Sequence, residues 1–523
     1  MSVCIVGAGL AGTMMAAMLN KLGFQVHVYE KRPQSGIEKS AEEFGLSQSA
    51  SKRSINLALS QRGIEALAAV DLLDAAMENA IPMPCRVIHQ IGSATSLKQP
   101  YGKSHEAIHS VSRQLLNELL LMKTKNVPKS RVEYFFGYSL VSCDKAGNCV
   151  FHQAESSTDN ADGAMVRKNG NGVAPAPAAH VAGEDICRRY DLVIGSDGAY
   201  SQVRESMLRL GRVNFSRTYI AHGYKELCIP PRMVESTDPS SGARVLTPTF
   251  ALDDHQGLHI WPRGEFMLIA LPNPDKSFTA TLFAPYSGSD GFDSVDDTDP
   301  AAVRGYFLRH FPDALPLMPD IAEDFRANPI GSLVTVRVDP WMQGPMVLVG
   351  DAAHAVVPFY GQGMNAAFED CLILYQLIQK RLVAGSAEAK SCGSAGGQRP
   401  AEGSQQALQA LLLSAADEFA RTRMPAGNAL ADLCIEHYAD MASNTASTWY
   451  LMQKRMEALL HWAFPASFVP LYTMIAFTRT PYHEAMRIAA RQEGIARMAL
   501  GAVAAASAVG IGLGLWARSR YKL

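Results

Sequence analysis

The chain has 523 residues, of which 48% are apolar, and its formal net charge is −2. This length allows one large α/β core with additions, or two to three modest domains. The near-neutral charge, without a basic run or a zinc-ligand spacing, argues against a nucleic-acid-binding protein. The nine cysteines are scattered and fit neither a disulfide framework nor a metal site. We therefore expect a reducing compartment and no bound metal.

The first thirty residues carry a nucleotide-binding pattern. An apolar strand runs into Gly7-x-Gly9-x-x-Gly12, and an expected helix and second strand then lead to Glu30. The three glycines permit a tight turn, a close approach to a pyrophosphate, and packing of the helix on the strand. Glu30 is placed to accept hydrogen bonds from an adenosine ribose and disfavours a phosphorylated one, which leaves NAD or the ADP half of FAD. Because a buried strand begins almost at once, no signal peptide is expected.

A second glycine-rich stretch, residues 350–370, decides between these two cofactors. It follows the apolar run 346–349 and contains Asp351 and the sequence Gly361-Gln-Gly363-Met364-Asn365. Asp351 can accept hydrogen bonds from ribityl hydroxyls. The helix that begins at the glycine pair can direct N–H groups at the flavin N1–C2=O edge, where negative charge develops on reduction. A plain NAD dehydrogenase has no use for this second contact set, so the sequence indicates FAD.

A third stretch agrees with this interpretation. Residues 191–204 form an expected strand followed by the acidic turn Asp197-Gly198. Together, the three stretches resemble the fingerprints of the single-component flavoprotein aromatic hydroxylases. That resemblance implies that the Asp197 turn lies near FAD and bears on the reductant. It also implies that NAD(P)H visits the flavin transiently, without a nucleotide domain of its own.

Longer motifs resemble one family within that class, the kynurenine 3-monooxygenases. They are residues 53–63 (RSINLALSQRG), 108–113 (IHSVSR), 222–227 (HGYKEL), 258–264 (LHIWPRG), 350–370 and 470–474 (PLYTM). The resemblance covers nearly the whole chain and implies an α/β fold. Its expected parts are a Rossmann-type FAD-binding domain of the aromatic-hydroxylase fold, an antiparallel β-sheet substrate domain, a C-terminal helical domain and a C-terminal transmembrane helix.

We divide the chain accordingly. The FAD-binding domain is expected in three parts, at 1–110, 111–205 and 341–383. The β-sheet substrate domain is expected at 206–340, where short alternating runs indicate an antiparallel sheet, and the helical domain at 407–497. Two polar segments without apolar periodicity, 154–185 and 384–406, are interpreted as disordered surface insertions.

The segment 498–517 contains no charged residue and is flanked by arginines and a lysine. As a helix it would be about 30 Å long, which matches the hydrocarbon core of a bilayer. A buried Ala/Gly helix is the alternative, but such a helix has little need of basic flanks. We interpret the segment as a tail anchor. The resemblance implies the mitochondrial outer membrane, with the catalytic part facing the cytosol.

The resemblance also implies roles for individual residues. Arg86 and Tyr101 match a pair that holds the substrate α-carboxylate, Tyr472 matches a third substrate contact, and Phe359 and Tyr360 would lie between flavin and substrate. The expected cofactor-binding set is Gly7, Gly9, Leu10, Gly12, Glu30, Lys31, Arg32, Ala58, Arg113, Leu140, Asp197, Asp351, Gly361, Gly363, Met364 and Asn365. No side chain is expected to act as a catalytic acid or base, because the flavin performs the chemistry.

One stretch departs from the family pattern. The family places an Asn and a Glu where this chain has His437 and Asp440, and we keep His437 as a substrate-binding candidate. Without the resemblance, Arg86 would be taken as an ordinary solvated cation and Tyr472 as a core residue. His354 is interpreted as a structural or flavin-edge residue rather than a base.

The activity implied by the resemblance is the hydroxylation of L-kynurenine to 3-hydroxy-L-kynurenine in tryptophan degradation. NADPH and O2 would be co-substrates, and the reaction would pass through a C4a-hydroperoxyflavin. One alternative is a membrane-anchored monooxygenase of the same fold that acts on another aromatic compound or an alkene. An apolar substrate would give Arg86 no carboxylate to bind. A flavin-free interaction protein is a third possibility, but it predicts broken fingerprints.

Overall fold

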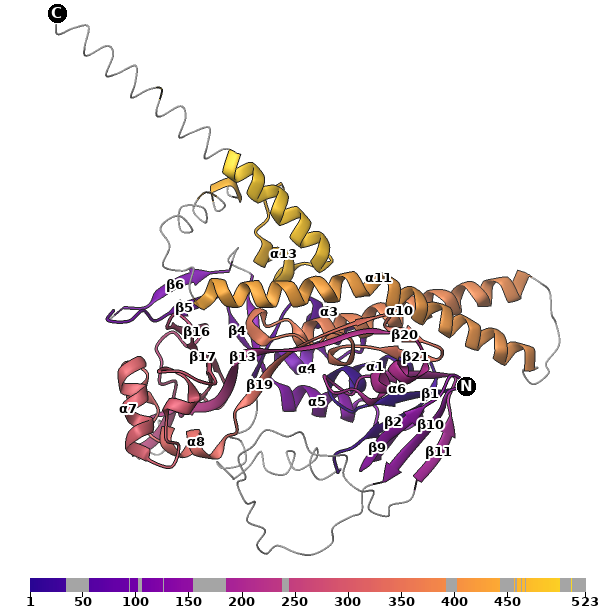
Figure 1. The fold of residues 1–523 in the computed structure, drawn as a ribbon, viewed down its shortest axis with the longest axis horizontal. Coiled ribbons are helices and arrows are strands. Elements are labelled where there is room, and N and C mark those ends of the chain that lie inside the picture. The colour runs from indigo at the N-terminus through magenta and orange to yellow at the C-terminus, as the bar shows by residue number, and fades with distance from the viewer. Residues whose placement is uncertain are drawn as a thin grey trace, which may run out of the picture.

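The computed structural model describes residues 1–33, 56–93, 95–101, 106–125, 127–153, 185–237, 244–391, 402–442, 456, 459–461, 463–465, 467–498 and 509. Within these residues the chain forms a six-stranded sheet, a seven-stranded sheet and a set of long helices that cover both (Figure 1). The predicted insertion at 154–185 lies outside the described residues except for Asp185, which begins a strand.

The six-stranded sheet is built from the nucleotide-binding pattern. Its order is β20 (Met342–Gln343), β21 (Met346–Leu348), β12 (Leu192–Gly195), β1 (Ser2–Val6), β2 (Gln25–Glu30) and β8 (Val132–Phe136). All neighbours are parallel except the short β20. The core strands β1, β12 and β21 are buried and rich in Val and Ile, as expected of strands covered on both faces. The predicted Rossmann-type arrangement is confirmed.

Helices cover one face of this sheet and a second, antiparallel sheet covers the other. The helices are α1 (Leu10–Lys21), α5 (Arg113–Met122) and α10 (Gly363–Ser391), which pack on one another. The covering sheet contains β9 (Tyr138–Cys143), β10 (Asn148–Gln153) and β11 (Asp185–Arg189). Tyr29 of β2 stacks on Phe151 of β10 with ring centroids 3.6 Å apart, which joins the two sheets through a shared aromatic core.

The seven-stranded sheet forms the substrate domain. Its order is β19 (Gly331–Asp339), β13 (Asn214–Ile229), β18 (Phe278–Pro285), β17 (Met267–Pro272), β16 (Gly257–Pro262), β5 (Cys85–Ile88) and β6 (Leu97–Pro100). The antiparallel prediction for 206–340 is confirmed. The prediction that all of 1–110 belongs to the FAD-binding part is wrong, because β5 pairs in parallel with β16 and carries residues 85–100 into the substrate sheet.

Smaller elements complete the molecule. The helices α7 (Pro300–His310) and α8 (Ile321–Ala327) cover the substrate sheet through a core that includes Phe307 and Phe325. A three-stranded sheet of β3 (Asn56–Leu59), β7 (Ile108–Ser112) and β4 (Ile81–Met83) lies beside α3 (Gln61–Ala69) and α4 (Leu73–Met77). The remaining elements are the hairpin β14 (Arg232–Thr237) and β15 (Arg244–Thr249), the helices α6 (Gln202–Leu210) and α9 (Asp351–His354), and the 3-10 turns η2 (Phe292–Ser294), η3 (Leu315–Leu317) and η4 (Pro358–Tyr360).

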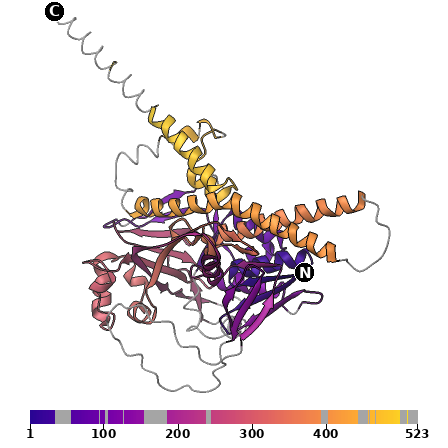
Figure 2. The same ribbon diagram turned by 45° about the vertical axis from the view of Figure 1, so that its right-hand side comes forward.

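Long helices dominate the C-terminal part. α10 packs along α11 (Glu402–Ala442), and the paired ends of both helices extend beyond the sheets (Figures 1 and 2). Residues 384–391 and 402–406 are therefore helical, which corrects the prediction of a loop over 384–406. Ala, Glu, Lys and Gln in these residues are good helix formers and continue both helices. α13 (Leu471–Phe477) and the helical residues 482–498 follow.

No helix within the described residues is long and apolar enough to cross a bilayer. Of the predicted anchor at 498–517, only Met498 and Val509 are among those residues, so the rest of this segment lies outside the part of the chain that the structure describes.

Candidate active site

The turn between β1 and α1 offers open space for an anion. An added Cβ at Gly12 would lie 1.9 Å from the Gly7 carbonyl oxygen, so close helix packing requires this glycine. A Cβ at Gly9, in contrast, would meet no atom within 4 Å. Gly9 is the N-cap of α1, where no described side chain caps the helix and the first turn holds no acid. The N–H groups of this turn are thus available to a pyrophosphate.

Glu30 ends β2 beside this turn and is 4% exposed. Its carboxylate accepts hydrogen bonds from Ala8 N at 2.8 Å and from Arg32 Nε at 2.8 Å. Burial opposes ionisation, but the hydrogen bonds from Arg32 and Ala8 outweigh it and hold the pKa of Glu30 below its ordinary value. Glu30 is therefore a charged acceptor at the edge of the sheet, and the Arg32 side chain pairs with it there. Lys31 is also exposed.

Asp197 follows β12 at the same edge of the sheet. Its Oδ2 accepts hydrogen bonds from the N–H groups of Gln202 and Val203, at 2.6 and 3.2 Å. Its Oδ1 is buried and has no hydrogen-bond partner among the residues that the structure describes. Burial raises the pKa of this carboxyl. An unsatisfied buried oxygen is costly, which points to a ligand donor that completes its hydrogen bonding.

Asp351 follows β21 and begins α9. Its side chain is exposed although the flanking Gly350 and Ala352 are buried, so it faces the open edge of the sheet. Desolvation by the surrounding protein raises the pKa of the Asp351 carboxyl. The charges of His354 and of Arg113, which begins α5, act in the opposite direction and lower it. Arg113 and Asp351, two predicted cofactor-binding residues, thus lie close enough in the fold to interact.

Asn365 lies in the first turn of α10, and its side chain has a structural role. Its side chain is fully buried, and its Nδ2 donates to the carbonyls of Ala58 and Gly361 at 2.7 and 3.0 Å. Its Oδ1 accepts from Ser60 N at 2.9 Å. The side chain therefore fastens the end of β3 to the start of α10 and positions the turn between η4 and α10.

These features fit FAD. Gly7, Asp197 and Asp351 follow the carboxyl ends of β1, β12 and β21, which are parallel neighbours, so they meet at one sheet edge. The set combines an uncapped helix N-terminus, an acid for the ribose and a second, separate group of polar sites for a longer ligand. Three predicted residues belong to the hydrophobic core or its border: Leu10 and Leu140 are 9% and 4% exposed, and Met364 packs against that core. Gly361 and Gly363 flank the turn into α10.

A charged aromatic cluster lies on the substrate sheet. The Arg86 guanidinium carbon is 4.7 Å from the ring centroid of Tyr472 and 5.4 Å from that of Tyr101. The Tyr101 and Tyr472 rings stack with centroids 5.0 Å apart, and Tyr472 in turn lies 5.7 Å from Tyr360. Arg86 comes from β5, Tyr101 follows β6, and Tyr472 lies in α13. The structure thus brings together three predicted substrate residues from distant parts of the chain.

The electrostatics of this cluster suit a carboxylate. Burial works against the charge of Arg86, but the neighbouring phenol groups of Tyr101 and Tyr472 more than offset it and raise its pKa, so Arg86 is charged. Burial raises the pKa of both phenols, which remain neutral donors. The Tyr101 hydroxyl is buried and has no hydrogen-bond partner of good geometry in the described part of the chain. A carboxylate here would gain a guanidinium and phenol donors.

Phe359 and Tyr360 form η4, directly before Gly361, and are 8% and 6% exposed. The Phe359 ring lies 4.2 Å from Tyr438 of α11 and 5.1 Å from Phe283 of β18. These side chains form an aromatic wall between the substrate sheet and residues 361–363, the turn into α10, which we call the flavin loop. His437 lies in α11 beside Tyr438, but its side chain is outside the described part of the chain.

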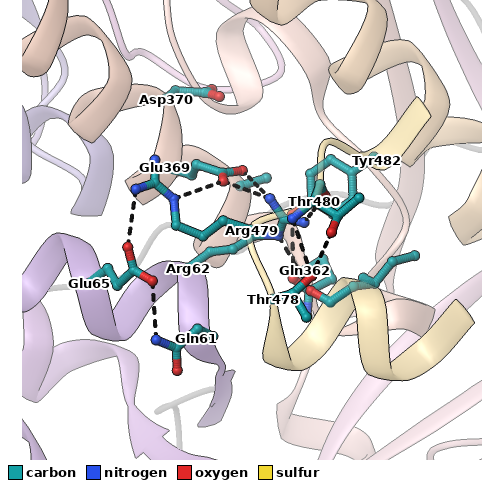
Figure 3. A network of polar contacts seen from close by, with 12 residues as sticks. Gln61, Arg62, Glu65, Gln362, Glu369, Asp370, Thr478, Arg479, Thr480 and Tyr482 are labelled. Carbon is teal, nitrogen blue, oxygen red and sulfur yellow. Dashed lines mark hydrogen bonds and ion pairs between the residues drawn. The ribbon is translucent and has the colours of Figure 1, made fainter. Parts of the chain in front are cut away.

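Sequence reasoning missed a buried ionic network that joins α3 and α10 (Figure 3). It includes Arg62, Glu369, Asp370 and Arg423, all 4% exposed or less. His354 belongs to it, because its Nε2 lies 2.6 Å from Asp370 Oδ2. Arg62 and Glu369 are 307 residues apart in the sequence, so no local pattern could predict that they pair.

The fold and this site define a flavoprotein of the aromatic-hydroxylase class. A family model described as an FAD binding domain matches residues 1–405. A tetrameric form of 2-methyl-3-hydroxypyridine-5-carboxylic acid oxygenase aligns with a TM-score of 0.54 at 18% identity, over 84% of this chain and 91% of that one. A probable FAD-dependent monooxygenase from Pseudomonas aeruginosa aligns with a TM-score of 0.51 at 16% identity, over 84% and 98%. At these identities the two structures establish the fold.

Curated relatives are closer in sequence. Kynurenine 3-monooxygenase from Dictyostelium discoideum is 36% identical over 93% of this chain and 90% of its own length. The enzyme of the same name from Sus scrofa is 36% identical over 93% and 86%, and the one from Salinispora arenicola is 36% identical over 98% and 97%. The chain therefore belongs to the kynurenine 3-monooxygenase family, and it is an FAD-dependent monooxygenase.

Proposed function

We propose that this chain hydroxylates L-kynurenine at ring position 3, with NADPH and O2 as co-substrates. The observation that carries the proposal is the charged Arg86 side chain packed against the rings of Tyr101 and Tyr472. This cluster combines a carboxylate receptor with an apolar wall, and kynurenine combines an amino-acid carboxylate with an aromatic ring. Membership of the family supports the same substrate.

The protein contributes binding, orientation and exclusion of water. Arg86 and the phenols of Tyr101 and Tyr472 would hold the α-carboxylate, and a charge-assisted pairing of this kind contributes about 1.5–3 kcal/mol. Phe359, Tyr360 and Tyr438 would keep the substrate ring dry and aligned. Bound FAD, once reduced, would supply an activated oxygen atom from O2. The substrate ring is already electron-rich, so no side chain need serve as a strong base.

Stopped-flow absorbance tests this proposal directly. NADPH is mixed with the FAD-loaded protein with and without L-kynurenine, and the flavin reduction rate is compared. We expect strong acceleration by kynurenine and formation of 3-hydroxykynurenine when O2 is admitted. A flavoprotein whose reduction ignores kynurenine, and which forms no hydroxylated product, would contradict the assignment. NADH in place of NADPH establishes the preference for the reductant.

The second candidate is a monooxygenase of the same fold with a different aromatic or an apolar substrate. The decarboxylated analogue of kynurenine separates the two. If the carboxylate is held by Arg86, the analogue should bind at least about tenfold more weakly than kynurenine, which is the effect of losing one charge-assisted hydrogen bond. Equal binding would favour the second candidate and point the search toward apolar compounds.

We further propose that residues 498–517 anchor the protein in the mitochondrial outer membrane, with the catalytic part in the cytosol. The support is the absence of charge over this segment and the basic residues on both sides of it. Imaging of the full chain with a fluorescent fusion at its N-terminus, together with protease protection, tests both the membrane and the orientation. An N-terminal reporter protected by intact mitochondria would contradict the proposal.

A further inference from the structure

Arg62 joins the flavin loop to the segment that carries Tyr472. It lies in α3 and is fully buried. Its Nη1 donates to both carboxylate oxygens of Glu369 in α10, at 2.6 Å each. Its Nε donates to the Ile475 carbonyl at 3.3 Å, and its Nη2 donates to the Thr480 carbonyl. One side chain thus bonds to α10 and to the chain on either side of the turn after α13.

The short helix α13 depends on outside contacts. It has seven residues, and a helix of this length is not stable alone. The carbonyls of its last turn have no partner inside the helix, and Arg62 satisfies one of them, Ile475 O. Thr478 Oγ1 donates to another, Met474 O, at 2.5 Å. Because Tyr472 lies one turn before these carbonyls, what holds the end of α13 also holds Tyr472.

Glu369 is the central acceptor of this network (Figure 3). Besides Arg62, it pairs with Arg423 of α11 at 2.7 Å and lies 3.6 Å from Arg479 Nε. Arg423 also donates to Asp370 at 2.7 Å. Burying such pairs adds little net stability, because the cost of desolvation offsets their attraction. Their geometry is nevertheless specific, and they fix α10 relative to α11 and to residues 478–482.

Tyr482 connects the ionic network to the flavin loop. Its ring lies 4.1 Å from the guanidinium carbon of Arg62 and 5.5 Å from that of Arg423. Its hydroxyl is 3.4 Å from Oε1 of Gln362, which stands between Gly361 and Gly363. The chain that leaves α13 therefore returns to the start of α10, where the sequence and the fold place the flavin edge.

We infer that Arg62 and Glu369 are positioning residues for substrate binding: they fix α13 against α10 and so hold Tyr472 between Tyr101 and Tyr360, beside Arg86. Neither residue belongs to the charged aromatic cluster itself. They act through the backbone of α13 and couple the placement of the carboxylate site to that of the flavin loop. The identity of the substrate in this inference rests on the proposed function, but the mechanical link does not.

The first experiment measures hydrogen exchange in the FAD-loaded protein without substrate. Arg62→Lys retains the charge but cannot bridge Glu369, Ile475 and Thr480 together. We expect amides of residues 471–477 to exchange about tenfold faster or more, because α13 loses its anchor. The control is Arg421→Lys, on the exposed face of α11, where Arg421 pairs only with Asp417 among the described residues. Unchanged exchange in α13 of the Arg62 variant would overturn the inference.

The second experiment is a double-mutant cycle with L-kynurenine. Arg62→Lys should raise KM about tenfold, lower the yield of product per NADPH and change kcat little. In combination with Tyr472→Phe the effects should be far from additive, since both changes act on one contact. Additive effects on KM would overturn the inference. If wild-type protein does not turn over kynurenine, the proposed function fails, and the exchange experiment still decides the mechanical link.

Glu369→Gln provides a second variant that keeps the side-chain volume. It should loosen α13 in the same way, because it weakens the anchoring of Arg62. If both variants fail to fold while Arg421→Lys folds, the network serves the fold as a whole, and the positioning role is overturned.

Discussion

Gly9 and Gly12 are three residues apart, yet substitution should affect them differently. At Gly12 an added Cβ would lie 1.9 Å from a backbone oxygen, so Gly12→Ala should prevent folding of the FAD-binding domain. At Gly9 the Cβ would meet no protein atom within 4 Å, so Gly9→Ala should fold normally. It would instead occupy the space over the first turn of α1. We expect its FAD affinity to fall about tenfold or more, the effect of displacing one phosphate contact.

Fluorescence titration of the deflavinated Gly9→Ala protein measures this affinity, and thermal unfolding checks its fold. Wild-type FAD affinity in a folded Gly9→Ala protein would show that this turn does not hold the pyrophosphate.

Arg86 is the residue that we expect to determine specificity for a substrate with a carboxylate. Arg86→Ala should raise KM for L-kynurenine about 10- to 100-fold, because it removes about 1.5–3 kcal/mol of charge-assisted hydrogen bonding. A misplaced substrate ring should also divert reducing equivalents to hydrogen peroxide. Steady-state kinetics with separate measurement of product and peroxide checks both effects. Lys98→Ala, which removes an exposed cation from the adjacent β6, serves as the control. Unchanged KM and peroxide yield in Arg86→Ala would remove the assigned role.

Some of the predicted cofactor-binding residues carry a local signature in the sequence. Gly7, Gly12 and Glu30 can be recognised from their spacing within one strand–helix–strand unit. The structure contains that unit as β1, α1 and β2. Asn365 also stands in a recognisable motif, but its amide serves the backbone of Ala58 and Ser60. That role could not be read from spacing, because it depends on a partner about three hundred residues away.

At the scale of elements, the assignment of β5 shows what local patterns leave open. The run Cys85–Ile88 predicts a strand, but no feature of it indicates which sheet it joins. β5 joins the substrate sheet because it pairs in parallel with β16, which lies more than one hundred and fifty residues later in the chain. The consequence is functional, since this pairing carries Arg86 out of the FAD-binding domain and onto the substrate sheet.

A histidine pair at the same two strands predicts pH-dependent stability: His89 directly follows β5, and His259 lies in β16. His89 Nε2 lies 2.9 Å from Nδ1 of His259, whose Nε2 bonds to the Asp254 carbonyl. Burial, and then the nearby His89, lowers the pKa of His259 to about 4 from 6.5. His259 therefore takes up a proton near pH 6.5 in the unfolded chain, but only near pH 4 in the folded protein. Stability contributed by neutral His259 is complete above pH 6.5 and is lost as the pH falls toward 4.

Between pH 7 and pH 5 this single group should reduce the free energy of unfolding by about 2 kcal/mol. Urea unfolding of the wild type and of His259→Gln at both pH values measures the effect. The variant should be less stable at pH 7 but should lose distinctly less stability on acidification. An equal loss in both proteins would show that His259 does not titrate in this range. His255→Gln, at an exposed histidine shortly before β16, is the matched control.

At the scale of the whole molecule, the order of layers follows from the sequence, whereas the contacts between distant parts do not. Three fingerprints predict the six-stranded sheet, and alternating runs predict the substrate sheet. The helices α10 and α11 extend into residues for which the sequence predicts a loop, because small residues such as Ser and Gly, without an apolar stripe, hide the helical pattern. The ionic network that joins α3, α10 and α11 to α13 has no signature in the sequence.

The proposed tail anchor yields a prediction for the whole chain. Removal of residues 499–523 should release the protein from membranes while leaving FAD content and flavin reduction unchanged, because the FAD-binding and substrate sheets lie entirely before this segment. Sedimentation of membranes after an alkaline carbonate wash, followed by immunoblotting, measures the release. Loss of FAD in the truncated protein would show that the segment also supports the catalytic part.

Truncation alone does not distinguish a helix that spans the bilayer from a segment that binds to the membrane surface. The decisive variant therefore changes one residue. Leu513→Arg places a charge inside the apolar segment, and a charge at the centre of a spanning helix costs about 2.5–3.5 kcal/mol. This cost should shift much of the protein to the soluble fraction. Tyr521→Arg, outside the segment, adds the same charge and should leave membrane binding intact. If Leu513→Arg stays with the membrane as firmly as the wild type, the segment is held by another protein or by the surface, and it does not span the bilayer.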